Sequence, residues 1–160
     1  MISPPLSQTL GWLSDSLARL LPRAEQAGVR LHLENTPYCF RPTLKELVDV
    51  VNSVGNPKLG IVYDVANAAY IGEDPVEGLL THHAAIGLVH ISDTGLEEWG
   101  HDPIGTGVVD FEGLGRAVET TGKGKDVVLE IIREKNPLGE INTGLGALRK
   151  RGWTVTPDEA

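Results

Sequence analysis

The sequence lacks the features that mark secreted and membrane proteins. Its single cysteine, Cys39, cannot form a disulfide within the chain. The first residues, Met1 to Pro5, contain neither the basic region nor the apolar core of a secretion signal. The composition, with 41% hydrophobic and 22% charged residues in a chain of 160, is typical of one globular domain and argues against disorder or membrane insertion. We therefore expect a cytoplasmic protein with no membrane partner.

Basic residues are also in short supply. The chain has 14 Lys and Arg residues against 22 Asp and Glu residues, which gives a formal net charge of -8. Affinity for a nucleic-acid backbone rests largely on lysine and arginine, so we expect no nucleic-acid partner. A small molecule or a metal ion fits this charge better.

What the sequence does contain is a set of four short apolar runs that end in polar residues. An alternating apolar run predicts a buried strand, and a polar group at its end is costly to bury unless it has a function. Each run supplies one potential metal ligand near its carboxyl end. The runs cover residues 29–34, 59–64, 86–93 and 126–130, and the ligands are Glu34, Asp64, His90 and Glu130.

Amphipathic segments between these runs predict helices. Leucines recur at helical spacing between Leu10 and Leu21, and similar patterns follow each strand. The alternation of strand and helix favours an α/β fold built from parallel βα units. The residues expected to cap these helices are Gly28, Thr43 with Glu46 as a capping box, Asp74 followed by Pro75, and Asp110.

The geometry of parallel strands relates the four potential ligands to one another. Side chains alternate with a period of two, so each ligand shares a face with the residue two positions before it. Parallel strands present their carboxyl ends on one side, so the four groups converge if the sheet curls into a barrel. Three carboxylates and one imidazole suit Mn²⁺, Mg²⁺, Co²⁺ or Zn²⁺.

Several short motifs accompany these ligands in a fixed order. They are Leu-Glu-Asn at 33–35, Tyr-Asp-Val-Ala-Asn-Ala at 63–68 with Gly-Glu-Asp-Pro at 72–75, Val-His-Ile-Ser-Asp at 89–93, Pro-Ile-Gly-Thr-Gly at 103–107 with Asp-Phe at 110–111, and Leu-Glu-Ile at 129–131. The ordered set resembles the xylose isomerase-like barrels, which include sugar phosphate isomerases and epimerases, sugar dehydratases and type IV abasic-site endonucleases. The resemblance covers about residues 24–153 and corresponds to the C-terminal half of a TIM (β/α)8 barrel.

The resemblance implies roles for individual residues. In the epimerase branch, it implies that Glu34, Asp64, His90 and Glu130 hold the metal, and that Glu34 and Glu130 are also catalytic and exchange protons with the substrate carbon. Substrate contact is expected from Asn67, a position often held by histidine in the family. The same is expected of His101, which stands where epimerases tend to carry arginine and endonucleases histidine.

The length of the chain limits how much of such a barrel it can form. A complete barrel needs about 250 residues. We therefore expect residues 1–160 to form one partial barrel domain with a polar tail at 154–160. Such a domain would either self-associate or pair with a missing N-terminal half, because open sheet edges are templates for pairing.

Other polar and small residues leave two readings open. Asp93 lies just past the third strand and would either stabilise a turn or orient a metal ligand. Gly105 and Gly107 would form either a phosphate cradle or a flexible loop. His32, one layer below the ligands, is expected to fill the barrel interior.

The leading hypothesis is a divalent-metal-dependent isomerase or epimerase that acts on a small sugar or ketose by proton transfer next to a carbonyl. A sugar or polyol dehydratase of the same family would use the same groups. A metal-dependent abasic-site endonuclease would need a basic groove and more histidines. The charge, Asn67, and Trp99 at a position where an aspartate ligand would be expected argue against it. A non-catalytic truncated remnant is the third alternative.

Overall fold

The computed structural model describes residues 5–123, 127–132 and 136–155. It contains a four-stranded sheet in the order β1-β2-β3-β4, and every neighbouring pair is parallel. The prediction of an α/β fold built from parallel βα units is confirmed. The strands are β1 (Leu31–Glu34), β2 (Leu59–Asp64), β3 (Ile86–Ile91) and β4 (Val127–Leu129).

Three strands are shorter than predicted, and β3 ends at Ile91 rather than at residue 93. The N–H of Val29 donates to the Ala24 carbonyl as part of the cap that ends the first helix, so β1 begins two residues later than expected. Glu130 follows β4, although its N–H still donates to the Ile91 carbonyl at 3.0 Å and continues the ladder. Asp126, the first residue of the predicted fourth strand, lies outside the described residues.

The predicted helices form, and they begin and end at the expected caps. Gly28 ends the first helix with φ 72°, and Thr43 and Glu46 make both hydrogen bonds of a capping box. Asp74 and Asp110 accept backbone N–H groups at the starts of two further helices. These helices are α1 (Leu6–Ala27), α2 (Leu44–Val54), α4 (Pro75–His82), α5 (Phe111–Thr121) and α6 (Pro137–Lys150).

One helix was not predicted. The short helix α3 (Val65–Tyr70) begins directly after β2, and the Asp64 side chain caps it by accepting the N–H of Asn67 at 2.7 Å. Its sequence, Val-Ala-Asn-Ala-Ala-Tyr, is too short to show a helical period, and the sequence pattern places its capping residue, Asp64, at the end of a strand. As a consequence, one carboxylate both ends a strand and starts a helix.

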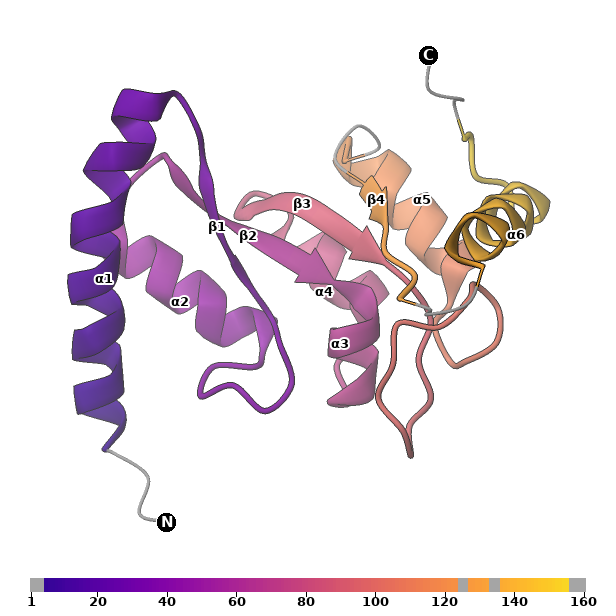
Figure 1. Cartoon of the computed structure of the whole chain (residues 1–160), viewed down its shortest axis with the longest axis horizontal. Helices are drawn as coiled ribbons and strands as arrows, with labels where there is room; N and C mark the ends of the chain where they lie inside the picture. The colour runs from indigo at the N-terminus through magenta and orange to yellow at the C-terminus, as the bar shows by residue number, and fades with distance from the viewer. Residues whose placement is uncertain (1–4, 124–126, 133–135, 156–160) are drawn as a thin grey trace.

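The core lies between one face of the sheet and the helices that cover it (Figure 1). Fully buried side chains on this face, such as Tyr63 and Val89, pack with Leu79 of α4 and Leu114 of α5. A smaller apolar cluster joins α1 to α2 and the start of β2. None of the described helices is long and apolar enough to cross a membrane.

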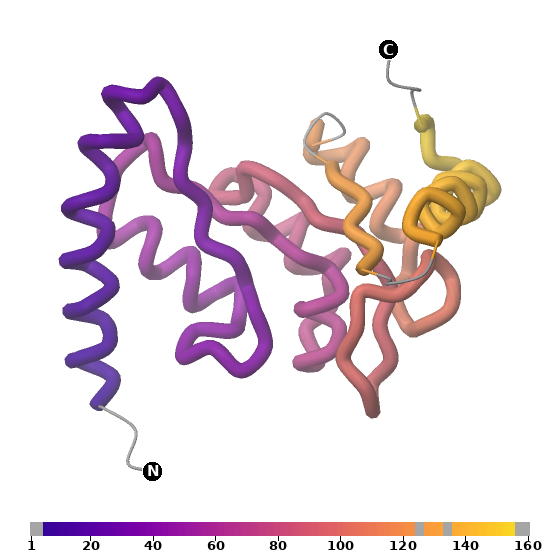
Figure 2. The backbone as a smooth tube through the Cα atoms, viewed as in Figure 1, coloured from indigo at the N-terminus to yellow at the C-terminus, as the bar shows by residue number. Residues whose placement is uncertain are grey.

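The opposite face of the sheet carries the predicted ligands. In the strand register, Glu34 lies beside Val62, Asp64 beside His90, and His90 beside Val128, so these residues share one face. The loop after β1, helix α3 and the long loop after β3 gather on one side of the sheet (Figure 2). The carboxyl ends of the strands therefore point toward one cluster of loops, as the parallel arrangement predicts.

Candidate functional site

The four predicted metal ligands converge at the carboxyl ends of the strands. Glu34, Asp64, His90 and Glu130 each offer one ligand atom, and these atoms all lie within 4.8 Å of one another. His90 Nδ1 lies 2.7 Å from a Glu130 oxygen and 3.6 Å from a Glu34 oxygen. We refer to these four residues as the ligand cluster. It brings together residues separated by up to about a hundred positions, because parallel strands end on the same side of a sheet.

The electrostatics of the ligand cluster favour a cation. Asp64 is fully buried, and burial raises the pKa of its carboxyl to about 8. The N–H of Asn67 opposes this rise in pKa, whereas the negative charges of Glu130 and Glu34 add to it. Three carboxylates so close together repel one another when they are ionised, and a bound divalent ion would relieve that repulsion.

Buried atoms without hydrogen-bond partners test whether these residues fit a metal. Among the described residues, Asp64 Oδ2, His90 Nδ1 and Glu130 Oε2 are buried and make no hydrogen bond of good geometry, although His90 Nδ1 and Glu130 Oε2 lie 2.7 Å apart. Unsatisfied buried polar atoms are rare because each costs free energy, and three of them here belong to one cluster. The mixed oxygen and nitrogen set suits Mn²⁺, Mg²⁺, Co²⁺ or Zn²⁺, so the residues fit a divalent ion.

Asn35 fixes the backbone that carries Asp64. Its fully buried amide donates to the Asp64 carbonyl at 2.9 Å and accepts the Asp64 N–H at 2.7 Å. The end of β1 is thereby joined to the end of β2 by two hydrogen bonds. Sequence reasoning gave Asn35 no role beyond its place in the Leu-Glu-Asn motif.

The two predicted substrate-binding residues lie beside the ligand cluster in different settings. His101 Nδ1 lies 3.6 Å from an Asp64 oxygen, 3.8 Å from a Glu130 oxygen and 3.0 Å from the Ser92 hydroxyl. Asn67 is 2% exposed, and its side-chain oxygen accepts the indole N–H of Trp99 at 2.8 Å. Substrate contact by these residues stays a prediction.

Asp93 organises the long loop after β3. Its carboxylate is fully buried and accepts four backbone N–H groups at 2.8 to 3.1 Å. The donors are Thr94, Gly105, Gly107 and Val109. Asp93 therefore stabilises the long loop between Thr94 and Val109. Its predicted role in orienting a metal ligand stays a prediction.

The glycine pair of this loop is explained by the same contacts. Gly105 has φ 86°, which favours glycine, and a Cβ at Gly107 would collide with the Thr94 carbonyl. Both N–H groups donate to the Asp93 carboxylate, so the anion that this glycine loop holds is a side chain of the protein itself.

His32 lies one layer below the ligand cluster, as expected. Its ring lies against Gly60 of β2 and Gly87 of β3, and a Cβ at either glycine would collide with it. Gly87 falls where the β2–β3 register shifts, because Ile61 pairs with Ile86 and Val62 pairs with Leu88. The two glycines thus leave the space that the imidazole occupies.

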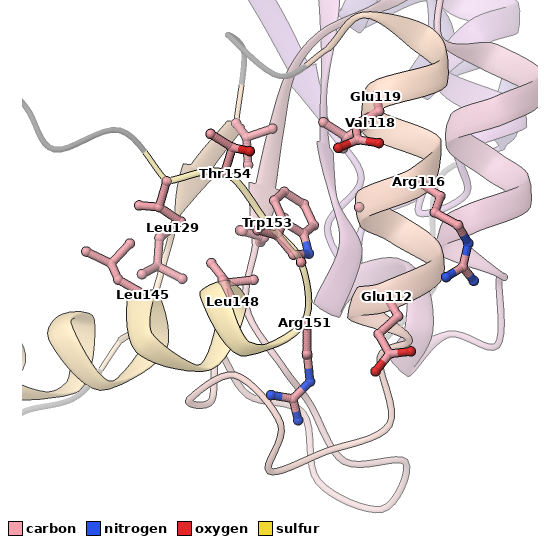
Figure 3. A pocket seen from close by; sticks show the side chains of 15 residues that line it. Glu112, Arg116, Val118, Glu119, Leu129, Leu145, Leu148, Arg151, Trp153 and Thr154 are labelled. Atoms are coloured by element: carbon pink, nitrogen blue, oxygen red, sulfur yellow. The ribbon is translucent and has the colours of Figure 1, made fainter.

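A cavity of about 520 Å³ lies on the other side of the sheet, between α5, α6 and residues 151–155 (Figure 3). Leu129, Leu148 and Trp153 line it, and the Trp153 indole N–H donates to the Phe111 carbonyl at 2.7 Å. Ile91 also lines it, and Ile91 points away from the face of its neighbour His90. This cavity is separate from the ligand cluster.

The fold and the ligand cluster define a parallel βα protein with a candidate metal centre at the carboxyl ends of its strands. The model of the xylose isomerase-like TIM barrel family matches residues 2–151. The chain belongs to this family, which confirms the resemblance of its motifs.

Two of the similar proteins are sugar epimerases, and a third is a protein with bound zinc. The chain is 26% identical over 129 residues to L-ribulose-5-phosphate 3-epimerase UlaE of Salmonella paratyphi A. These aligned residues make up 79% of this chain and 45% of that protein. Its fold matches 3-keto-D-glucoside 4-epimerase YcjR from E. coli with a TM-score of 0.78 at 22% identity, over 94% of this chain and 57% of the other. The IolI protein with a bound zinc atom matches with a TM-score of 0.71 at 23% identity, over 94% and 56%. The chain thus spans about half the length of the relatives that it matches.

Proposed function

We propose that the chain forms the metal-binding and proton-transfer half of a divalent-metal-dependent isomerase or epimerase that acts on a small sugar or ketose. The observation that carries this proposal is the convergence of three buried ligand atoms, Asp64 Oδ2, His90 Nδ1 and Glu130 Oε2, none of which makes a well-formed hydrogen bond. Together with Glu34 they form a complete oxygen and nitrogen donor set.

The residues of the cluster divide the chemistry between them. Glu34, Asp64, His90 and Glu130 would hold the ion, which when bound polarises the carbonyl and hydroxyl pair of a sugar. Glu34 or Glu130 takes a proton from the carbon next to the carbonyl, and the other glutamate returns one. Asp64 is fixed by Asn35 and by the start of α3, so it positions the site. His101 and Asn67 are assigned to the sugar, and Asp93 to orienting the loop that carries His101.

The relatives support this reaction class. L-ribulose-5-phosphate 3-epimerase and 3-keto-D-glucoside 4-epimerase both change the configuration of a sugar carbon, and IolI has been seen with zinc. An endonuclease would be expected to carry further metal ligands at positions 67 and 99. Asn67 and Trp99 stand there instead, and their side chains are hydrogen-bonded to each other. The cytoplasmic location stays a prediction.

A partner is part of the proposal. β1 and β4 are the edges of the sheet, and the interior face holds partly exposed groups such as Val128, which is 43% exposed. We expect further polypeptide to pair with these edges, either the remainder of a barrel or a second copy. Light scattering after size-exclusion chromatography should show the isolated chain self-associated. A monomer that unfolds in one sharp transition would contradict this expectation.

Replacement of His90 by alanine should weaken metal binding at least tenfold, because only three ligands remain. Equilibrium dialysis against Mn²⁺ followed by elemental analysis measures the effect, and the wild-type chain should bind one ion. His83→Ala is the matched control, since His83 is an exposed imidazole at the end of α4. Equal metal content in wild type and His90→Ala would remove the metal assignment.

A further inference from the structure

A row of aromatic side chains leads outward from the ligand cluster. The Trp99 ring lies 5.6 Å from the His101 ring, and Tyr38 lies 6.1 Å from Trp99 and 6.1 Å from Tyr70, all measured between ring centroids and all edge to face. We refer to Tyr38, Tyr70 and Trp99 as the aromatic row. His101, which lies beside Asp64 and Glu130, joins this row to the cluster.

The aromatic row is exposed and yet held in place. Tyr38 is 78% exposed and Trp99 is 38% exposed, although aromatic side chains of this size usually bury much of their surface. The Tyr38 and Tyr70 hydroxyls are 2.7 Å apart, and the Trp99 indole is hydrogen-bonded to the buried Asn67. One hydrogen bond therefore joins the two tyrosines, and a second anchors Trp99 to helix α3.

The backbone at Tyr38 is strained. Its φ of 66° lies in the left-handed region, which a bulky residue adopts only at a cost in free energy. Strained residues persist where the surrounding structure holds them, and they concentrate at ligand-binding and active sites. The strained backbone thus occurs at an exposed tyrosine beside the candidate active site, as is common for residues that contact a ligand.

The charges around the site disfavour a phosphate group. The Gly105 and Gly107 N–H groups, which could have held a phosphate, donate to Asp93. The ligand cluster itself contributes three carboxylates. Within residues 5–123, 127–132 and 136–155, no lysine or arginine forms an ion pair with the cluster, and Arg41 is paired with Glu46 at 3.0 Å.

We propose that the aromatic row binds the ring of a neutral glycoside, so that the substrate is a sugar without phosphate whose ring carries a ketone at the ligand cluster and extends past Trp99 to Tyr38. This inference deepens the proposed function and rests on it. The C–H face of a sugar ring is apolar and packs against an aromatic ring. The two tyrosine hydroxyls can exchange hydrogen bonds with sugar hydroxyls, as polar groups do in sites that fix the orientation of a ligand.

The test is a binding measurement on the full chain with Zn²⁺ present, because this ion is diamagnetic and does not broaden NMR signals. The probes are methyl glycosides of glucose, galactose, mannose and xylose, with ribulose 5-phosphate and inorganic phosphate as charged competitors. Saturation-transfer NMR should show contact from the protein to the ring C–H groups of at least one glycoside. Tyr38→Ala should weaken that binding roughly fivefold to tenfold, whereas Tyr38→Phe should retain most of it because the ring remains.

Two controls separate binding from folding. Trp12→Ala removes an exposed aromatic residue of α1 and should leave glycoside binding unchanged. Tyr38→Gly accepts the left-handed backbone without strain, so it should keep the thermal stability of the chain and still weaken binding. Metal content should be the same in every variant of Tyr38.

The outcomes are distinct. Absence of binding to every glycoside, equal binding by wild type and Tyr38→Ala, or tighter binding of the phosphates that does not depend on Tyr38 would each overturn the inference. A change of oligomeric state in Tyr38→Ala with unchanged glycoside binding would also overturn it and identify the row as a contact between copies. Loss of the proposed function would appear differently, as a wild-type chain that binds no metal.

Discussion

Replacement of Glu130 or Glu34 by glutamine should lower sugar turnover by at least ~10² to 10⁴-fold, the range that general acid-base catalysis contributes. Glutamine keeps the shape of the side chain but cannot accept the proton. Glu130 has one oxygen 2.7 Å from His90 Nδ1, so its replacement also disturbs the ligand cluster, and the loss there should be at least as large as at Glu34. The measurement is made on the active form of the enzyme, whether that is this chain or a complete barrel that contains it.

The same reaction leaves a trace in the product. Because one glutamate removes a proton and the other returns one, solvent hydrogen should enter the carbon next to the carbonyl during turnover. Incubation of candidate sugars in D₂O followed by NMR detects this label. Glu112→Gln is a matched control, because Glu112 lines the cavity on the other face of the sheet. Turnover without any solvent label would exclude proton exchange through these glutamates.

Replacement of Asp93 by alanine should lower the free energy of unfolding by about 3 kcal/mol or more, because four backbone N–H groups would lose a buried acceptor. Urea unfolding followed by tryptophan fluorescence measures the change. The loss arises in the loop after β3, so His101, which this loop carries, should also become less well positioned.

Asp110 provides the matched comparison for this variant. It is an aspartate near the end of the same loop that accepts the Gly113 N–H at the start of α5. An ordinary helix N-cap is worth about 1 kcal/mol, so Asp110→Ala should cost about a third as much as Asp93→Ala. Equal losses in the two variants would mean that Asp93 acts only as a local turn residue.

The sequence sufficed for the sheet and the ligand cluster because both follow from short-range patterns. Apolar runs with a period of two predicted the strands, and the parallel arrangement then required Glu34, Asp64, His90 and Glu130 to meet. The capping box at Thr43 and Glu46 is equally local, since both of its hydrogen bonds span three residues.

Features that depend on distant contacts could not be predicted in this way. The Trp99–Asn67 hydrogen bond joins residues 32 positions apart, and the Asn35–Asp64 pair joins residues 29 apart. The left-handed backbone of Tyr38 has no sequence signal, because tyrosine gives no preference for that conformation. The role of Asp93 could not be predicted because its four backbone donors lie in a long loop, and the conformation of that loop does not follow from a local sequence pattern.

The most direct test of the central claim is a crystal of the chain soaked in Zn²⁺ and measured with X-rays on both sides of the zinc absorption edge. The anomalous difference map should contain one strong peak about 2.0–2.2 Å from ligand atoms of Glu34, Asp64, His90 and Glu130. The same experiment on His90→Ala should show a weaker peak or none. A strong peak elsewhere with no density between these four side chains would contradict the assignment of a metal centre.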